Sequence, residues 1–289
     1  MTPACVIVTR PASDARNWVR RLQQAGLQAE ALPLIEIAPA SAAADVLALQ
    51  QAWQTLERYS ACMFVSANAA EHFFRPNTAL AQSETAQSAI NSIVNMDPDR
   101  LPPTLRLLAP GPGTVAALRA VGVPAAHIDA PPPEASQFDS EALWQVIGQR
   151  DWQGRRVLVV RGQTVAEDGG AGSSGRDWLA RQWQAAGAEV DFVVVYQRRA
   201  PQLTAAQLRR AKAASVDGAI WLFSSSEAVA NLLGQPALSG LDWRRARAVA
   251  THPRIAGVLR AAGWGVVAAS RPALADIRAV LGSIESGHP

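Results

Sequence analysis

The sequence predicts an α/β protein with two similar domains, each of them a parallel sheet flanked by helices. Segments with a strand pattern alternate with segments with a helical pattern, and this alternation favours parallel sheets with helical connections. Three kinds of strand–helix unit occur twice each, which indicates two related domains. The length of 289 residues also suits two domains of ordinary size.

The first kind of unit is a strand, a loop, a helix and a second strand. Its two copies span residues 5–37 and 156–199. In each copy an apolar, β-branched strand ends in an arginine, which is Arg10 in one and Arg161 in the other. We expect both arginines at the edge of a sheet where a ligand would bind.

The second kind is a short strand that leads into a helix through small polar residues. Its copies span residues 61–74 and 218–233. Ser66 and Ser224 come just after the strands, where a serine side chain can accept a hydrogen bond from the start of the helix.

The third kind is a strand, a tight turn, a helix and a strand, over residues 105–128 and 246–269. The helices of the first and third kinds are all expected to end at a glycine, where a left-handed residue closes the last turn. These glycines are Gly26, Gly122, Gly187 and Gly263.

Two stretches lie outside the repeated units. Residues 77–104 are polar and end in prolines, which predicts a surface excursion. Residues 131–138 predict a stiff loop before a helix that begins near residue 139.

A G-x-G-x-x-G spacing at Gly170, Gly172 and Gly175 is the pattern of a dinucleotide site. That motif should begin where a strand ends, but the strand is predicted to end near Arg161, and two acidic residues in between would repel a phosphate. The next strand also lacks the acidic end that binds a ribose. We therefore interpret residues 163–175 as a flexible Gly/Ser loop.

The composition excludes several classes of protein. With 18% charged residues and a net charge of +3, the chain has no dense basic run with interleaved aromatics, which disfavours nucleic-acid binding. No apolar run reaches the ~18 residues of a membrane helix, and the start lacks the features of a signal peptide, so we expect a cytoplasmic protein. The histidines and the two cysteines, Cys5 and Cys62, show no metal-ligand spacing, so no metal site is expected.

Candidate ligand groups follow the predicted strands. In open α/β sheets, ligands bind beyond the carboxyl ends of the strands, and a cleft between two such domains is a natural site. The residues at these positions are Arg10, Ser66, residues 111–114, Arg161, Ser224 and residues 251–254.

Eight segments occur in the order that they take in uroporphyrinogen-III synthases, and the chain resembles that family over residues 6–279. The segments are "VIVTRP", "LPLIEIAP", "FVSANAA", "APGPGTVAALRAVGV", "SEALW", "RVLVVRG…GRDWLARQWQAAGAEVDFVVVYQR", "LFSSSEAV" and "HPRIAGVLRAAG". Each segment alone is a generic α/β turn, whereas the ordered set is specific.

The resemblance implies a discontinuous first domain. In this family the chain leaves the first domain after one unit, builds the whole second domain and returns along a two-stranded linker. Domain one would be residues 1–35 plus 200–289, and domain two would be residues 39–195, with linkers at 36–38 and 196–199. The repeated units fit this division and a cut into contiguous halves equally well.

The resemblance also implies a lyase of porphyrin and heme biosynthesis. Members of the family cyclise hydroxymethylbilane, a linear tetrapyrrole with eight carboxylates, and they invert its last pyrrole ring without a cofactor or metal. Such an enzyme must hold a bent substrate and shield an azafulvene cation from water. It is expected to be a monomer that makes only transient contact with the preceding bilane-forming enzyme.

By the same resemblance, Tyr196 assists departure of the substrate hydroxyl, and the alternative is a tyrosine that packs at the linker. The residues expected to bind substrate are Arg10, Ser66, Asn68, Gly113, Thr114, Arg161, Ser224, Ser225 and Arg254. Their hydroxyls would also cap helices, and the arginines would meet substrate carboxylates or pair with nearby acids. His252 is interpreted as a turn residue rather than a base.

Rival functions come from other classes of protein. The main alternative is a two-domain cytoplasmic ligand-binding protein with the same fold but no turnover. A nucleotide-dependent transferase is disfavoured because the glycine motif is displaced and no G-x-x-x-x-G-K-[ST] loop occurs. A synthase-like chain that has lost its activity also stays open.

Overall fold

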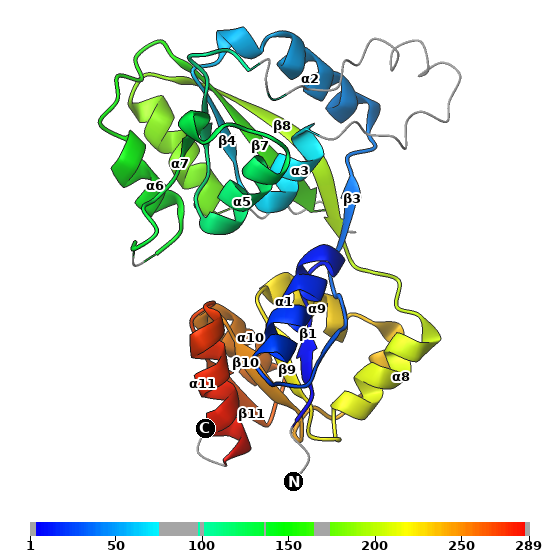
Figure 1. The fold of residues 1–289 in the computed structure, drawn as a ribbon. Coiled ribbons are helices and arrows are strands. Elements are labelled where there is room, and N and C mark those ends of the chain that lie inside the picture. Colours follow the sequence, from blue (N-terminus) through cyan, green and yellow to red (C-terminus); the bar gives the residue numbers. More distant parts are fainter. Residues whose placement is uncertain (1–3, 75–97, 99–100, 136, 165–173, 287–289) are drawn as a thin grey trace. The chain divides into compact units, whose positions relative to one another are not determined.

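The structure is a computed structural model that describes residues 4–74, 98, 101–135, 137–164 and 174–286. The chain folds as two compact units (Figure 1). Unit 1 contains Met1–Glu36 and Arg199–Pro289, and unit 2 contains Ile37–Arg198. The domain boundaries expected from the sequence remain a proposal about which segments fold together.

Unit 1 is built on a five-stranded sheet with the order β11-β10-β9-β1-β2. The strand pairs are all parallel. The strands are β1 (Val6–Val8), β2 (Ala29–Ala31), β9 (Ile220–Phe223), β10 (Arg247–Ala250) and β11 (Val266–Ala269). The inner strands β1 and β9 are buried along their whole length because helices cover both faces of the sheet.

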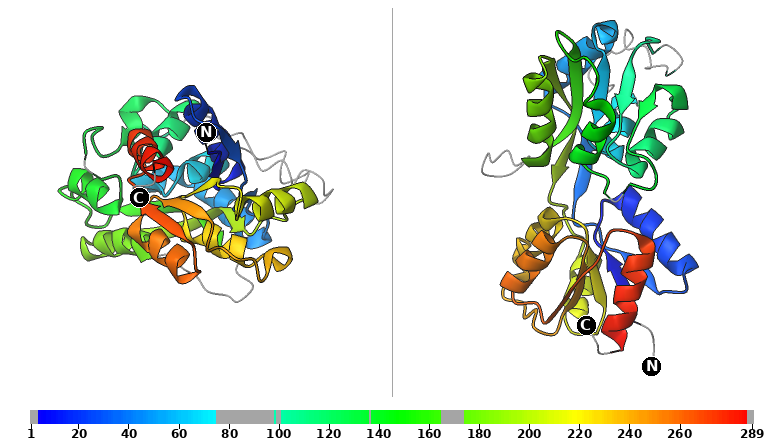
Figure 2. Two further views of the ribbon diagram at one scale, coloured as in Figure 1. Left: turned by 90° about the horizontal axis from the view of Figure 1, so that it is seen from below. Right: turned by 90° about the vertical axis from the view of Figure 1, so that its left-hand side faces the viewer.

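The helices of unit 1 form two layers. Helices α1 (Ala12–Gln24) and α11 (Leu274–Glu285) pack on the face formed by Val6, Val8, Ile220 and Leu222. Helices α8 (Ala205–Ala214), α9 (Ser226–Leu233) and α10 (Pro253–Ala261) complete the unit, and the right-hand view of Figure 2 shows α9 and α10 on the side opposite α1 and α11.

Unit 2 contains a six-stranded sheet with the order β3-β8-β7-β4-β5-β6. The pairs from β8 through β6 are parallel. The strands are β3 (Glu36–Pro39), β4 (Ala61–Phe64), β5 (Arg106–Leu108), β6 (Ile128–Asp129), β7 (Arg156–Thr164) and β8 (Glu189–Arg199). The expected neighbours β3 and β8, which carry the chain between the units, do lie side by side.

Alternate residues of β4 and β7 point to opposite faces of this sheet, as the pleat requires. One face packs against α2 (Ala43–Gln54), α3 (Ala67–Phe74) and α5 (Pro112–Ala120). The other face packs against α6 (Ser140–Ile147) and α7 (Ser174–Ala185). Short 3₁₀ turns lie at Leu56–Arg58 and Ala125–His127 in unit 2 and at Pro236–Leu238 in unit 1.

The predicted fold class is therefore confirmed, and so is the role of the four helix-ending glycines. Each has a left-handed backbone, with φ of 83° at Gly26, 100° at Gly122, 83° at Gly187 and 81° at Gly263. After α1, the amides of Gly26 and Leu27 donate to the carbonyls of Gln23 and Leu22, which closes the helix in a Schellman motif.

Other predictions differ from the structure or lie outside it. Strand β7 was expected to end near Arg161 but continues to Thr164, because it pairs with the long strand β8 through a bulge. The predictions for residues 77–104 and 163–175, including Gly170 and Gly172, lie largely outside the described residues. None of the helices that the structure describes combines the length and apolar character of a membrane span.

Candidate functional site

Each sheet has one topological switch point, which is a pair of neighbouring strands from which the chain continues toward opposite edges of the sheet. In unit 1 this switch point lies between β1 and β9, because β1 leads to β2 and β9 leads to β10 and β11. In unit 2 it lies between β4 and β7, because β4 is followed by β5 and β6 and β7 by β8. The carboxyl ends of the strands at a switch point form the usual ligand crevice of open α/β sheets.

Arg10 and Ser224 lie at the switch point of unit 1. Val8 pairs with Leu222, so Arg10 and Ser224 each stand two residues beyond that pair on neighbouring strand ends. Arg10 donates to Asp14 at 2.9 Å, and its guanidinium carbon lies 4.7 Å from the ring centre of Trp18. Arg10 therefore does pair with a nearby acid, although its Nε atom is buried and has no partner among the described residues.

The serine that caps α9 differs from the one that the sequence predicted. Ser225, not Ser224, caps α9, because its Oγ accepts from the amide of Glu227 at 3.1 Å. The expectation that Ser224 caps this helix is wrong, since β9 ends at Phe223 and the helix begins only at Ser226. The Oγ atoms of Ser224 and Ser226 are buried and have no hydrogen-bond partner among the described residues.

His252 lies in the turn between β10 and α10 of unit 1, where its role is structural. It is the N-cap of α10, and its Nδ1 accepts from the amide of Arg254 at 3.1 Å. This confirms the interpretation of His252 as a turn residue. Arg254 is exposed in the first turn of the same helix, a position that suits an anion.

A hydrogen-bonded pair of hydroxyls lies at the switch point of unit 2. Ser66 Oγ and Tyr196 Oη are 3.1 Å apart, and Ser66 Oγ also accepts from the amide of Ala69 at 3.1 Å. Ser66 thus caps α3 as expected and links the phenol to the start of that helix. Asn68 is half-buried in the first turn of α3, beside this pair in the sequence.

The ring of Tyr196 is fixed by close packing. A Cβ atom added at Gly162 would lie 2.2 Å from Tyr196 Cζ, so only glycine leaves room for the ring there. The His72 ring stacks against it with centres 5.8 Å apart and planes at 26°. Tyr196 is only 2% exposed, so its ring is held in one place and its hydroxyl has little freedom.

Gly162 and His72 were not identified from the sequence as parts of a site. A signal for Gly162 existed, because a glycine inside a strand pattern marks a bulge or a close approach of another group. The pairing register does shift between Arg161 and Gly162, at the point where Gly162 faces Tyr196. No comparable pattern in the sequence pointed to His72.

The remaining expected residues of unit 2 lie around this edge of the sheet. Arg161 places its guanidinium carbon 4.6 Å from the ring centre of Phe192, with no acidic partner among the described residues. Gly113 is exposed in the first turn of α5, whereas Thr114 is only 5% exposed. Gly111, not Thr114, is the N-cap of that helix, so the expected capping by Thr114 is wrong.

Within the residues that the structure describes, no three His, Cys, Asp or Glu side chains gather as a metal ion would require. The groups present are hydroxyls, arginines and amides at helix starts, which are suited to binding carboxylates and to moving a proton.

Comparisons with known proteins agree on one family. Residues 16–278 match the family model described as uroporphyrinogen-III synthase HemD. A solved uroporphyrinogen-III synthetase from Helicobacter pylori is similar at a TM-score of 0.54 and 15% identity, covering 98% of this chain and 100% of that chain. A mutant uroporphyrinogen III synthase from Thermus thermophilus is similar at a TM-score of 0.51 and 12% identity, covering 98% and 99%. At these identities the solved structures support the fold alone.

Proposed function

Because this chain belongs to the uroporphyrinogen-III synthase family, we propose that it cyclises hydroxymethylbilane to uroporphyrinogen III with inversion of the last pyrrole ring. The reaction releases one water, so the enzyme is a lyase of tetrapyrrole and heme biosynthesis. It needs no cofactor or metal. The observation that carries the proposal beyond family membership is the half-buried, hydrogen-bonded Ser66–Tyr196 pair at the switch point of unit 2.

Tyr196 is the proposed proton donor to the departing hydroxyl. Ser66 Oγ accepts the amide hydrogen of Ala69, so its own hydrogen is available for the oxygen of Tyr196. The phenol hydrogen is then left for the substrate. As the carbon–oxygen bond of the hydroxymethyl group breaks, the proton leaves with the hydroxide as water and an azafulvene cation remains.

The tyrosinate formed in that step is stabilised by Ser66 and by the positive end of α3. The α-carbon of the last pyrrole ring that already carries the bridge attacks the cation and becomes a spiro centre. Its old bond to the bridge then breaks, and the bridge bonds again to the ring's free α-carbon, which leaves the ring inverted. The last pyrrole ring finally loses the proton of its newly bonded α-carbon, and this proton restores the phenol of Tyr196. The Tyr196 ring is itself buried, and the bound substrate must also be shielded from water because the cation would otherwise be hydrated.

The substrate carboxylates and pyrrole hydrogens need fixed partners. We assign the carboxylates to Arg10, Arg161 and Arg254, which stand at carboxyl ends of strands or at a helix start. The other proposed contacts are Asn68, Gly113, Thr114, Ser224 and Ser225. The buried Ser224 hydroxyl, which has no partner among the described residues, supports this assignment because a ligand group would recover its lost hydrogen bond.

The remaining parts of the proposal concern the whole protein. The two domains comprise residues 1–35 plus 200–289 and residues 39–195, with linkers at 36–38 and 196–199. The protein acts in the cytoplasm as a monomer and makes transient contact with the enzyme that supplies its bilane.

Turnover of freshly made hydroxymethylbilane tests the proposal. The products are oxidised, and their I and III isomers are separated by chromatography. A III isomer that dominates only when this protein is present supports the synthase. If only the I isomer forms, as in buffer alone, the proposal fails and the two-domain ligand-binding protein without turnover becomes the better function.

Replacing Tyr196 with phenylalanine is expected to lower kcat for the III isomer about 100-fold, the usual contribution of a general acid. The chain's other tyrosine supplies a matched control. Tyr59 Oη donates to Asp191 at 3.0 Å, and its loss in Tyr59→Phe should cost only about 1 kcal/mol of stability. Equal kcat values for Tyr196→Phe and the wild type would remove Tyr196 from the mechanism.

A further inference from the structure

A pocket of about 450 Å³ lies in unit 2, at the edge opposite the Ser66–Tyr196 pair. It is lined by residues just before β4, just before β5 and just before β7, which are neighbouring strands. Ser66 follows the carboxyl end of β4, and Arg161 lies in the second half of β7, so the pocket is distinct from the proposed substrate site. Its volume falls within the range of small-molecule sites, about 300–1,000 Å³.

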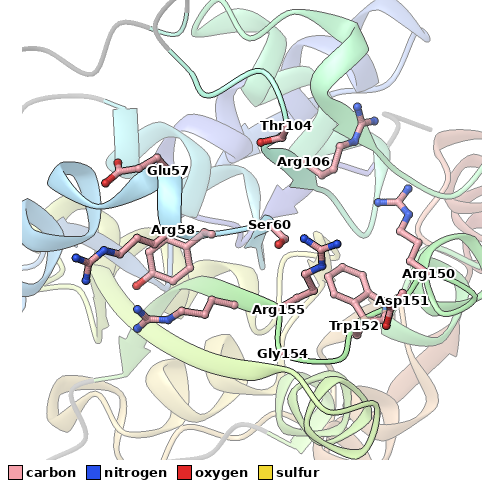
Figure 3. A pocket seen from close by; sticks show the side chains of 12 residues that line it. Glu57, Arg58, Ser60, Thr104, Arg106, Arg150, Asp151, Trp152, Gly154 and Arg155 are labelled. Carbon is pink, nitrogen blue, oxygen red and sulfur yellow. The ribbon is translucent and has the colours of Figure 1, made fainter.

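Arginines dominate the lining of this pocket (Figure 3). They are Arg58, Arg106, Arg150, Arg155 and Arg156. The guanidinium of Arg155 extends into the middle of the pocket near Ser60, whereas the carboxylates of Glu57 and Asp151 lie toward opposite ends of it (Figure 3). The centre of the pocket is therefore positive.

Three of these arginines are held in place by acids behind the lining. Arg106 and Arg150 share Asp129, with Nε and Nη1 respectively at 2.9 and 2.7 Å from its Oδ2. Burial alone would raise the pKa of Asp129, but hydrogen bonds from the two arginines outweigh it and hold that pKa below its usual value. Asp129 thus stays ionised, and one carboxylate serves two guanidiniums. Arg156 is paired with Asp191 at 2.6 Å.

Arg155 and Arg58 have no acidic partner among the described residues. Both are exposed, and the Trp152 ring beside Arg155 forms a buried apolar wall whose Nε1 already donates to Ile147 O at 3.1 Å (Figure 3). An unpaired guanidinium in a concave site is suited to bind a carboxylate or phosphate.

We propose that this pocket binds a small multivalent oxyanion, with Arg155 as the main ligand and Arg150 and Ser60 as supporting ones. Multivalent carboxylates and phosphates share the required chemistry, because each offers several oxygens that can accept paired hydrogen bonds from planar guanidinium groups. The site is independent of the proposed reaction, since none of its lining residues touches the Ser66–Tyr196 pair.

Calorimetric titration with citrate and with pyrophosphate, in a buffer without other multivalent anions, tests the proposal. At least one of the two should bind with one saturable site, and the anion that binds identifies a carboxylate or a phosphate ligand. Arg155→Gln should weaken the Kd about tenfold or more, the value of one charge-assisted hydrogen bond. Arg181→Gln, which removes an exposed arginine from α7, should leave the Kd unchanged.

Three results would overturn the proposal. They are no saturable binding of either anion, equal Kd values for Arg155→Gln and the wild type, and a loss of binding in Arg161→Gln instead, which would move the anion to the opposite edge of the sheet. Because binding is measured without turnover, a protein that fails to make the III isomer can still pass this test.

Discussion

Alanine at position 162 is expected to lower kcat for the III isomer by about 100-fold, as much as loss of the Tyr196 hydroxyl itself. The new Cβ would lie 2.2 Å from Tyr196 Cζ, so the ring must leave its place beside Ser66 and His72. Overpacking of this kind also costs about 1–3 kcal/mol of stability. Isomer-resolved turnover and urea unfolding measure the two effects.

Gly257→Ala is the matched control for Gly162→Ala. Gly257 is exposed on α10, and a Cβ there would meet nothing within 4 Å. This change should stabilise the protein by about 0.5–1 kcal/mol, because alanine favours a helix, and should leave kcat unchanged. If Gly162→Ala kept full kcat, the position of the Tyr196 ring would be irrelevant to the reaction.

Trp221→Ala is expected to destabilise unit 1 by about 3–5 kcal/mol, the cost of removing a buried tryptophan. Trp221 is fully buried, its Nε1 donates to Ala214 O at 3.2 Å, and its ring meets Trp243 and Trp264 edge-on at 6.0 and 5.8 Å. Urea unfolding measures the loss. Hydrogen exchange then shows which amides lose protection.

Amides of β9 and β10 should lose the most protection in Trp221→Ala, while those of β4 and β7 keep theirs. Trp183→Ala is the reciprocal control, because Trp183 is fully buried against Trp144 and Trp152 in unit 2. A uniform loss of protection across both units in either variant would contradict two domains that fold separately.

The local secondary structure could be predicted from the sequence, because it depends mainly on neighbours within about four residues. Alternating strand and helix patterns predicted the six repeated strand–helix units, but not α2 after β3 or α11 after β11. The glycines that end α1, α5, α7 and α10 were predicted because only the left-handed backbone that glycine favours closes such a helix. Ser66 was predicted as a cap for the same local reason.

The exact helix caps needed the structure, because they depend on where each strand stops pairing. Strand β9 ends at Phe223, so Ser225 is the cap, and the buried Oγ of Ser224 has no hydrogen-bond partner among the described residues. Strand β7 runs past its predicted end because β8 offers it a long partner.

The repeated units and the family could thus be predicted from the amino-acid sequence alone, whereas the contacts between distant segments required the three-dimensional structure. The fit of Tyr196 against Gly162, and its bond to Ser66, join residues far apart in the chain. The arginine pocket likewise collects the starts of β4, β5 and β7. Strand order and register create these contacts, and both are fixed by long-range packing that no local pattern encodes.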